Sequence, residues 1–172
     1  TAPIILFAQK VDEYDLGQRQ DKMDIILQMQ DTRTIYDGKL ISLLTDADPI
    51  IRARAVMAFG SIQDTSVLNL LVDRFTYDTD QQVRFMAAFA IGQTAGLLCK
   101  KSRQTLEHDL IWNRLDLQDE SGKQSFNPKE RLIEEIGKFG TEEALSDIIT
   151  RFGNIYPPLY MRGLTMSIAR FA

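Results

Sequence analysis

The sequence predicts an all-α protein, a right-handed superhelix of about four stacked helix pairs. Residues 51–60 and 83–92 share the pattern aliphatic-Arg-x-x-Ala-x-x-Ala-apolar-Gly, and the second copy follows the first by 32 residues. Each copy comes directly after an acidic, turn-like stretch, at 46–49 and at 78–81. A repeat of this period is typical of a solenoid, in which each helix pair buries its apolar faces only by stacking on its neighbours.

The N-terminal part precedes the first repeat and has two segments. Residues 1–8 (TAPIILFA) are apolar and are followed by Gln9 and Lys10. We expect this segment to pack on the core, and the alternative is the remnant of an export signal. A helix is expected at about 19–31, where Met23, Ile26 and neighbouring apolar residues recur with partial helical periodicity.

Each repeat unit is expected to be a first helix, a turn and a second helix. The turn side chain of Asp48 can cap the next helix, and Pro49 suits its first position. Gly60 and Gly92 are expected near helix C-termini, where glycine tolerates the left-handed conformation. The first helices are predicted at 38–45, 65–76, 103–116 and 141–152, and the second helices at 49–62, 80–95, 128–138 and 158–170.

Two further copies of the pattern are weaker. Gly137 matches Gly60 in the third copy, and Arg162 matches Arg52 in the fourth, which stops before it is complete. We therefore expect one domain over 1–172 that belongs to a longer chain, or whose last repeat another surface covers. Its predicted parts are an N-terminal segment and helix (1–37), repeats at 38–62, 65–95, 103–139 and 141–172, and an insertion near 96–126.

The insertion includes Trp112 and the polar run at 116–125. Arg84 and Lys129 are 45 residues apart, which exceeds the repeat period. One interpretation is a long loop that Trp112 pins to the core. The other is a loop that contacts a partner, because insertions in solenoids often lie on the binding face.

The repeat signature, followed by Asp64-Thr65 and a Leu-rich helix, resembles HEAT repeats over 40–95 and, more weakly, over 127–152 and 157–172. This resemblance implies a protein-interaction scaffold that binds a protein or peptide with its concave face, but such repeats specify an architecture better than a function. Residues 21–37 and 87–93 are also similar to the repeat region of bacterial cell-envelope proteins that often carry a cyclophilin-type prolyl isomerase domain. That narrower resemblance implies an envelope or periplasmic location, with the isomerase activity outside this chain.

Composition disfavours several other functions. The net charge is −4 and the pI is about 5.0, so a helical-repeat nucleic-acid binder is the less favoured alternative. No phosphate-binding loop, histidine pair or nucleophile motif is present, so we expect neither catalysis nor a cofactor or metal. Cys99, the only cysteine, is expected to be a small buried residue, and His108 a surface residue. No apolar run is long enough for a membrane span.

The arginines at equivalent repeat positions, Arg52, Arg84 and Arg162, have two interpretations. Each can reach an acidic turn of its own or the neighbouring repeat, which would form a ladder along the solenoid. Alternatively they form a row that binds anions, which the acidity of the chain disfavours.

Apolar residues off the expected core stripe are the candidate binding site. If Ile51, Ala55, Ala58 and Ile62 face the core, helical geometry turns Ala53, Val56, Met57 and Gly60 outward. The matching positions one repeat later are Phe85, Ala88, Phe89 and Gly92. These residues either contact neighbouring repeats or line a groove for an apolar peptide or helix. The predicted partner-binding residues are Met57, Phe85, Phe89 and Trp112.

Overall fold

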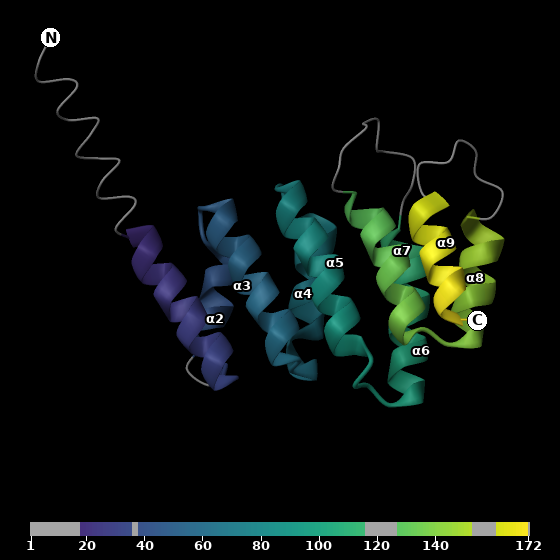
Figure 1. The fold of residues 1–172 in the computed structure, drawn as a ribbon, viewed down its shortest axis with the longest axis horizontal. Coiled ribbons are helices and arrows are strands. Elements are labelled where there is room, and N and C mark those ends of the chain that lie inside the picture. Colours follow the sequence, from purple (N-terminus) through teal and green to yellow (C-terminus); the bar gives the residue numbers. More distant parts are fainter. Residues whose placement is uncertain (1–17, 36–37, 116–126, 153–160, 172) are drawn as a thin grey trace, which may run out of the picture.

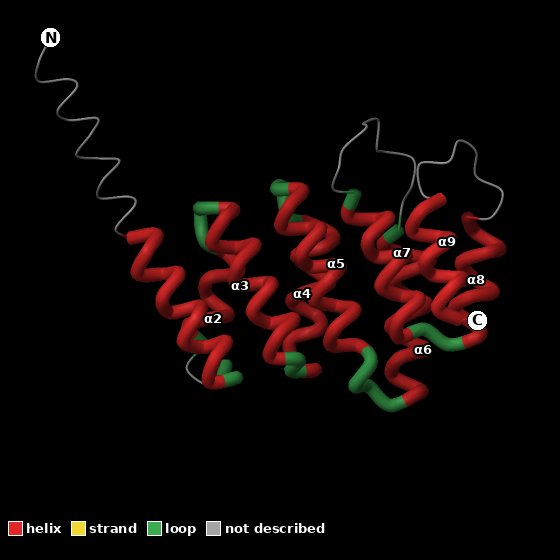
Figure 2. The backbone as a smooth tube through the Cα atoms, viewed as in Figure 1, coloured by secondary structure: helices red, strands yellow, loops and turns green. Residues whose placement is uncertain are grey.

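A computed structural model describes residues 18–35, 38–115, 127–152 and 161–171 of the chain. Every regular element in these ranges is a helix, and none of the described residues belongs to a strand (Figure 2). The residues 1–8 and the polar run 116–125, for which the sequence left alternatives open, lie outside the described ranges.

The helices follow the order expected from the repeats. A helix over 18–32 is followed by short elements, α2 (Lys39–Ser42) and the 3₁₀ turn η1 (Leu43–Thr45), where the sequence predicted one continuous helix at 38–45. The 3₁₀ turn η2 (Thr65–Val67) leads into α4. The remaining elements are α3 (Pro49–Ile62), α4 (Leu68–Tyr77), α5 (Gln81–Ala95), α6 (Lys100–Asp109), the π-helical turn η3 (Leu110–Arg114), α7 (Pro128–Phe139), α8 (Glu142–Phe152) and α9 (Met161–Phe171).

The second helices of the units form one continuous layer. α3 packs on α5, α5 on α7, and α7 on α9, while α4 packs against α5 within its own unit. Figure 1 shows these second helices following one another along the molecule in the order α3, α5, α7 and α9, with the purple helix 18–32 at one end. The protein is therefore an all-α helical-repeat solenoid, as the sequence predicted, and its core runs between neighbouring helix pairs.

The start of each of three second helices is fixed by a capping side chain. The Asp48 carboxylate accepts a hydrogen bond from the Ile50 N–H, and Pro49 occupies the first helical position of α3, as predicted. Asp80 caps α5 in the same way. In α7 the amide oxygen of Asn127 accepts from two backbone N–H groups. The acidic turns therefore begin helices, as the sequence indicated.

The repeated glycines serve helix packing. Gly60 and Gly92 lie near the C-termini of α3 and α5, as predicted, but neither adopts the left-handed conformation, and the left-handed residue after α3 is Gln63, with φ 61°. A Cβ added to Gly60 would lie 3.1 Å from the Cα of Ala90 on the next helix. At Gly137 it would lie 2.5 Å from the Cα of Ser167. Glycine is needed at these positions because the backbones of successive second helices approach closely.

The expectation that one side of α3 faces outward was also wrong for most of its residues. Ala53, Val56 and Gly60 are buried, and so are Ala88 and Gly92 of α5. The reason is that α3 lies between α5 and the helix over 18–32. The Gln30 side chain of that helix donates to the Ser61 hydroxyl at 3.2 Å, and its Ile26 is 1% exposed.

Candidate functional site

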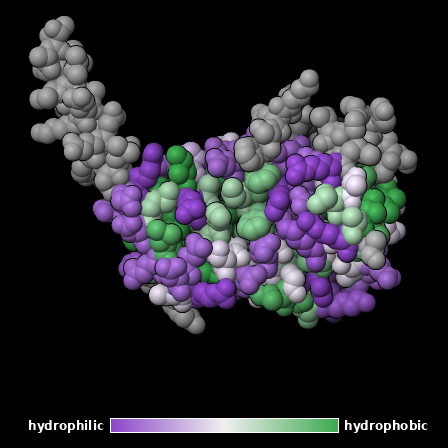
Figure 3. Space-filling model, in the orientation of Figure 1, coloured by the Kyte–Doolittle hydropathy of each residue, from purple (hydrophilic) through white to green (hydrophobic). Residues whose placement is uncertain are grey.

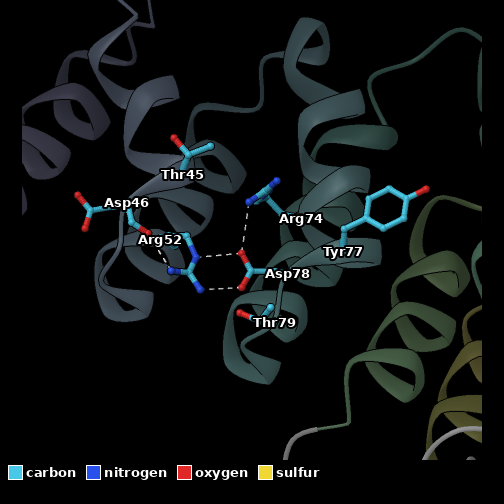
Figure 4. A pocket seen from close by; sticks show the side chains of 7 residues that line it. All are labelled: Thr45, Asp46, Arg52, Arg74, Tyr77, Asp78 and Thr79. Atoms are coloured by element: carbon cyan, nitrogen blue, oxygen red, sulfur yellow. Dashed lines mark hydrogen bonds and ion pairs between the residues drawn. The ribbon is translucent and has the colours of Figure 1, made fainter.

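The arginine of the first repeat forms a polar link to the next repeat. The Arg52 guanidinium donates to both carboxylate oxygens of Asp78, at 2.9 Å each, and to the Asp46 carbonyl of its own turn at 2.8 Å. Arg74 donates to Asp78 at 3.5 Å (Figure 4). The Asp78 side chain is only 2% exposed. Arg52 therefore joins its own turn to that of the following unit, as the ladder interpretation predicted.

The electrostatics of this link favour a structural role. Burial raises the pKa of Asp78, but its hydrogen bond with Arg52 and the charges of Arg52 and Arg74 outweigh burial and hold that pKa below its usual value. These side chains line a pocket of about 250 Å³. Because the Arg52 fork is already paired with a carboxylate, it does not present a ready anion site. Arg84 departs from the ladder interpretation, because it donates to the Phe75 carbonyl of α4 at 2.9 Å rather than to an acidic turn. Arg162 is exposed, so within the described ranges the predicted ladder is seen at Arg52 alone among the three arginines.

Three of the four predicted partner-binding residues lie on the layer of second helices. Met57 of α3 is 36% exposed, and Phe85 and Phe89 of α5 are half-buried. Phe89 reaches toward α3, because a Cβ at Gly60 would lie 3.7 Å from its ring. Figure 3 shows apolar side chains gathered over α3 and α5 and hydrophilic ones over α7. We call Met57, Phe85 and Phe89 the apolar strip.

Cationic side chains of α7 border the apolar strip. The Arg131 guanidinium lies over the rings of Phe85 and Phe89, at 5.7 and 5.2 Å from their centroids. The Lys138 ammonium lies 5.7 Å from the centroid of Phe89. Such contacts combine apolar burial with an electrostatic attraction to the ring face. The rings are therefore partly covered by charged groups that solvent still reaches.

A buried carboxylate organises these cations. Glu135 is fully buried, and one of its oxygens lies 2.5 Å from both the Arg131 guanidinium and the Lys138 ammonium. Arg131 and Arg170 of α9 also pair with Glu134, at 3.4 and 3.0 Å. In this network three cations share two carboxylates. The surface beside the apolar strip therefore carries a small excess of positive charge.

The sequence analysis missed this charged border. The signal was present in the strong amphipathic pattern of α7, but nothing local indicates which neighbouring helix a charged face meets. Glu135 and Arg131 are one helical turn apart, a spacing that permits their ion pair but also occurs on free helix surfaces.

Trp112 does not join the apolar strip. It lies in η3, which contacts α6 and α8 rather than the second-helix layer. Its indole N–H donates to Asp147 of α8 at 3.0 Å, and the Arg151 guanidinium lies 5.5 Å from its ring centroid. The four predicted residues therefore form two separate surfaces, and Trp112, although 39% exposed, holds η3 to α8.

The turn η3, which continues α6, is also held to α8 by a hydrogen bond. η3 is a π-helical turn, and the Arg151 side chain of α8 donates to the Ile111 carbonyl. Wide turns of this type leave carbonyl groups without their regular helical partner. Arg151 therefore both supplies a donor to η3 and covers Trp112.

Cys99 differs from its expected environment. It is exposed rather than buried, and hydrogen bonding to Ser102 lowers the pKa of its thiol. His108 is exposed, as expected, and its ring lies beside Trp112 with centroids 6.3 Å apart. Within the described ranges, no group of three or more His, Cys, Asp or Glu side chains is placed to hold a metal ion.

A comparison with known proteins bears on the second-helix layer and on the Arg52–Asp78 link between its units. Residues 38–111 match the family model for HEAT repeats. This match runs from α2 to the first residues of η3, the part in which the Arg52–Asp78 link and the apolar strip lie. No curated protein matches the chain. None of the helices described here has the length and apolar character needed to cross a bilayer.

Proposed function

We propose that this chain is a protein-interaction scaffold without catalytic activity of its own, and that it binds its partner through the second-helix layer. The observation that carries the proposal is the apolar strip on a layer of consecutive α3, α5 and α7 helices. Support also comes from the HEAT-repeat match, since such repeats commonly form extended binding surfaces.

The chemistry of the surface defines the partner segment. Met57 is exposed enough to be covered on binding, and two half-buried aromatic rings lie beside it. Arg131 and Lys138 of α7 border the rings, and together with Arg170 of α9 they share two carboxylates. We expect a partner helix or extended segment that places apolar side chains on the strip and acidic residues toward Arg131 and Lys138.

Photo-crosslinking tests where the partner binds. A benzophenone amino acid replaces Met57 in one variant and Leu70 of α4 in another. Both residues are 36% exposed, but Leu70 lies on a first helix. We expect a discrete protein adduct from position 57 in extracts of the source cells, and none of the same mass from position 70. Equal adducts at both positions, or none at position 57, would contradict the proposal.

The substitution Phe89→Asp tests whether the apolar strip itself binds the partner. It places a carboxylate beside Arg131 and Lys138 and removes the central ring of the strip, so the adduct from position 57 should fall at least about tenfold. Circular dichroism must show that the helices persist. Loss of helical signal in both Phe89→Asp and Phe85→Asp would show instead that these rings belong to the core.

The narrower resemblance to envelope proteins with a cyclophilin-type domain stays a prediction. It is tested by the intact mass of the endogenous protein and by a prolyl isomerase assay on it. An isomerase activity that requires a segment outside these 172 residues would make this chain the binding arm of that enzyme.

A further inference from the structure

A second pocket lies between α6 and α8. Its volume is about 190 Å³. Three carboxylates contribute to its wall, and its lining includes neither lysine nor arginine. The polar lining residues are Gln104, Glu107 and His108 from α6, and Thr141, Glu143 and Asp147 from the start of α8 and its first turns.

Glu107 is the unusual member of this lining. It is 2% exposed, which is rare for a carboxylate, and its Oε2 accepts a hydrogen bond from the Thr141 hydroxyl at 2.8 Å. Its Oε1 is buried and has no hydrogen-bond partner. A buried acceptor without a hydrogen-bond partner costs free energy, so nearly all buried acceptors in natural proteins have a partner. Because Glu107 lines the pocket, a donor that enters it reaches this oxygen once the side chains that cover the oxygen move aside.

Two arginines near the pocket donate their hydrogen bonds elsewhere, while the charge of Lys100 acts on Glu143. Arg103, one turn before Glu107, donates through Nη1 to the Phe139 carbonyl at 3.3 Å. Arg151 donates to the Ile111 carbonyl and covers Trp112. Burial raises the pKa of Glu107, and the Thr141 hydrogen bond and the Arg103 charge offset only part of this effect. A cation in the pocket would supply the stabilisation that these residues do not.

We propose that this pocket binds the ammonium group of a lysine side chain from a partner protein, with Glu107 Oε1 as the buried acceptor. Glu143 and Asp147 add negative charge at the wall. The proposal rests on the proposed function only in taking the lysine from a protein. It concerns a surface separate from the apolar strip.

Lysine fits this site better than arginine. A guanidinium is recognised best by two parallel hydrogen bonds to both oxygens of a carboxylate. Glu107 offers only one oxygen, since Thr141 occupies the other. An ammonium is a compact charge with three donors in rotatable positions, so it can use one buried acceptor and the surrounding carboxylates together.

Trp112 provides a local reporter for the pocket. It is the only tryptophan of the chain, and its indole N–H is bonded to Asp147 at 3.0 Å. Titration of Nα-acetyl-lysine amide at pH 7.5 and constant ionic strength should produce a saturable shift of the indole N–H signal in a ¹⁵N spectrum. The neutral Nε-acetylated form of this probe should produce none. Absence of saturation, or an equal effect of the neutral probe, would overturn the proposal.

Two variants and a matched control locate the binding. Glu107→Gln should weaken binding at least about tenfold, because hydrogen bonds to charged groups are the strong ones. Asp147→Asn, which keeps an acceptor for Trp112, should weaken it about two- to fivefold by removing one unit of charge. Glu142→Gln removes an exposed charge at the start of α8, outside the lining, and should leave affinity within about twofold. Unchanged binding in Glu107→Gln, or an equal loss in all three variants, would show that Glu107 is not the acceptor.

Two further probes test whether the bound cation comes from a protein or a free amine, and whether it is an ammonium or a guanidinium. A shift with pentylamine but not with Nα-acetyl-lysine amide would assign the pocket to a free amine and overturn the protein source. Tighter binding of Nα-acetyl-arginine amide would overturn the preference for lysine. None of these titrations involves α3 or α5, so their failure is distinguishable from failure of the crosslinking experiment at Met57.

Discussion

Asp78 shows how a single side chain can connect two repeats. Its carboxylate lies at the end of α4, accepts two hydrogen bonds from Arg52 of the preceding unit, and also accepts the backbone N–H of Asp80 at the start of α5. Since the Asp78 side chain is 2% exposed and that of Arg52 is 11% exposed, solvent screens their pair little. The turn of one unit is thereby fixed to the second helix of another.

We expect Asp78→Ala to destabilise the protein by about 3 kcal/mol, because removing one partner leaves the other charge of a buried pair uncompensated. Urea unfolding followed by circular dichroism measures the change. The control is Asp73→Ala, on an exposed position of the same helix, which should change stability by less than about 0.5 kcal/mol. Equal losses in the two variants would mean that the Arg52–Asp78 pair contributes nothing specific.

At the scale of the element, helix contacts depend on small residues at the crossings. Gly60 and Gly137 occupy matching positions in their units, and each lies where the next second helix approaches most closely. Glycine usually weakens a helix interior by about 0.5–1 kcal/mol relative to alanine. Its presence at matching positions is explained by packing between helices, which more than offsets this cost.

The substitution Gly137→Ala tests this balance. The added Cβ would lie 2.5 Å from the Cα of Ser167, so α9 must move, and we expect a net destabilisation of about 1–2 kcal/mol despite the better helix propensity of alanine. Gly96→Ala is the matched control. Its Cβ would lie 3.9 Å from Phe139, an ordinary contact, and its φ of −59° suits any residue. Thermal unfolding of both variants measures the difference, and a Gly137→Ala protein as stable as the control would contradict the packing argument.

At the scale of the whole molecule, stability depends on pH through two buried carboxylates whose pKa values are shifted in opposite directions. The pKa of Glu107 is raised above its ordinary value of 4.5 chiefly by burial, so between these two pKa values the folded state binds more protons than the unfolded state. Burial also raises the pKa of Asp78, but Arg52 lowers it below 3.8 overall, so its contribution is present above that pH and lost below it.

We therefore expect the free energy of unfolding to rise as the pH falls from neutral through the raised pKa of Glu107 toward about 4.5, and to fall at lower pH as Asp78 is protonated. Urea unfolding across this range measures the profile. In Glu107→Gln the rise on the acidic side of neutral should be reduced, while the loss at lower pH should persist. A variant with the same rise as the unmodified protein would show that Glu107 does not cause it.

The sequence by itself determined the local features of this protein. Helix periodicity, the capping residues Asp48 and Asp80 and the spacing of the repeat pattern predicted the fold class and placed nearly every described helix. It also predicted the Arg52 link, because the arginine follows the acidic turn of its own unit by one helical turn. The equivalent Arg84 bonds the Phe75 carbonyl of a helix instead, which the repeat pattern did not indicate. Local propensity and tertiary packing agree at these positions, which is the condition under which sequence patterns are most informative.

Tertiary structure alone decided which helix faces are covered. Periodicity relates residues to the axis of their own helix, but the number of neighbours around that axis depends on the assembly. α3 lies between α5 and the helix over 18–32, so Val56 is buried although it lies off the stripe that was expected to face the core. The same reason separates Trp112 from the apolar strip and brings Arg131 over Phe85 and Phe89. These contacts join residues distant in sequence, and no local pattern specifies them.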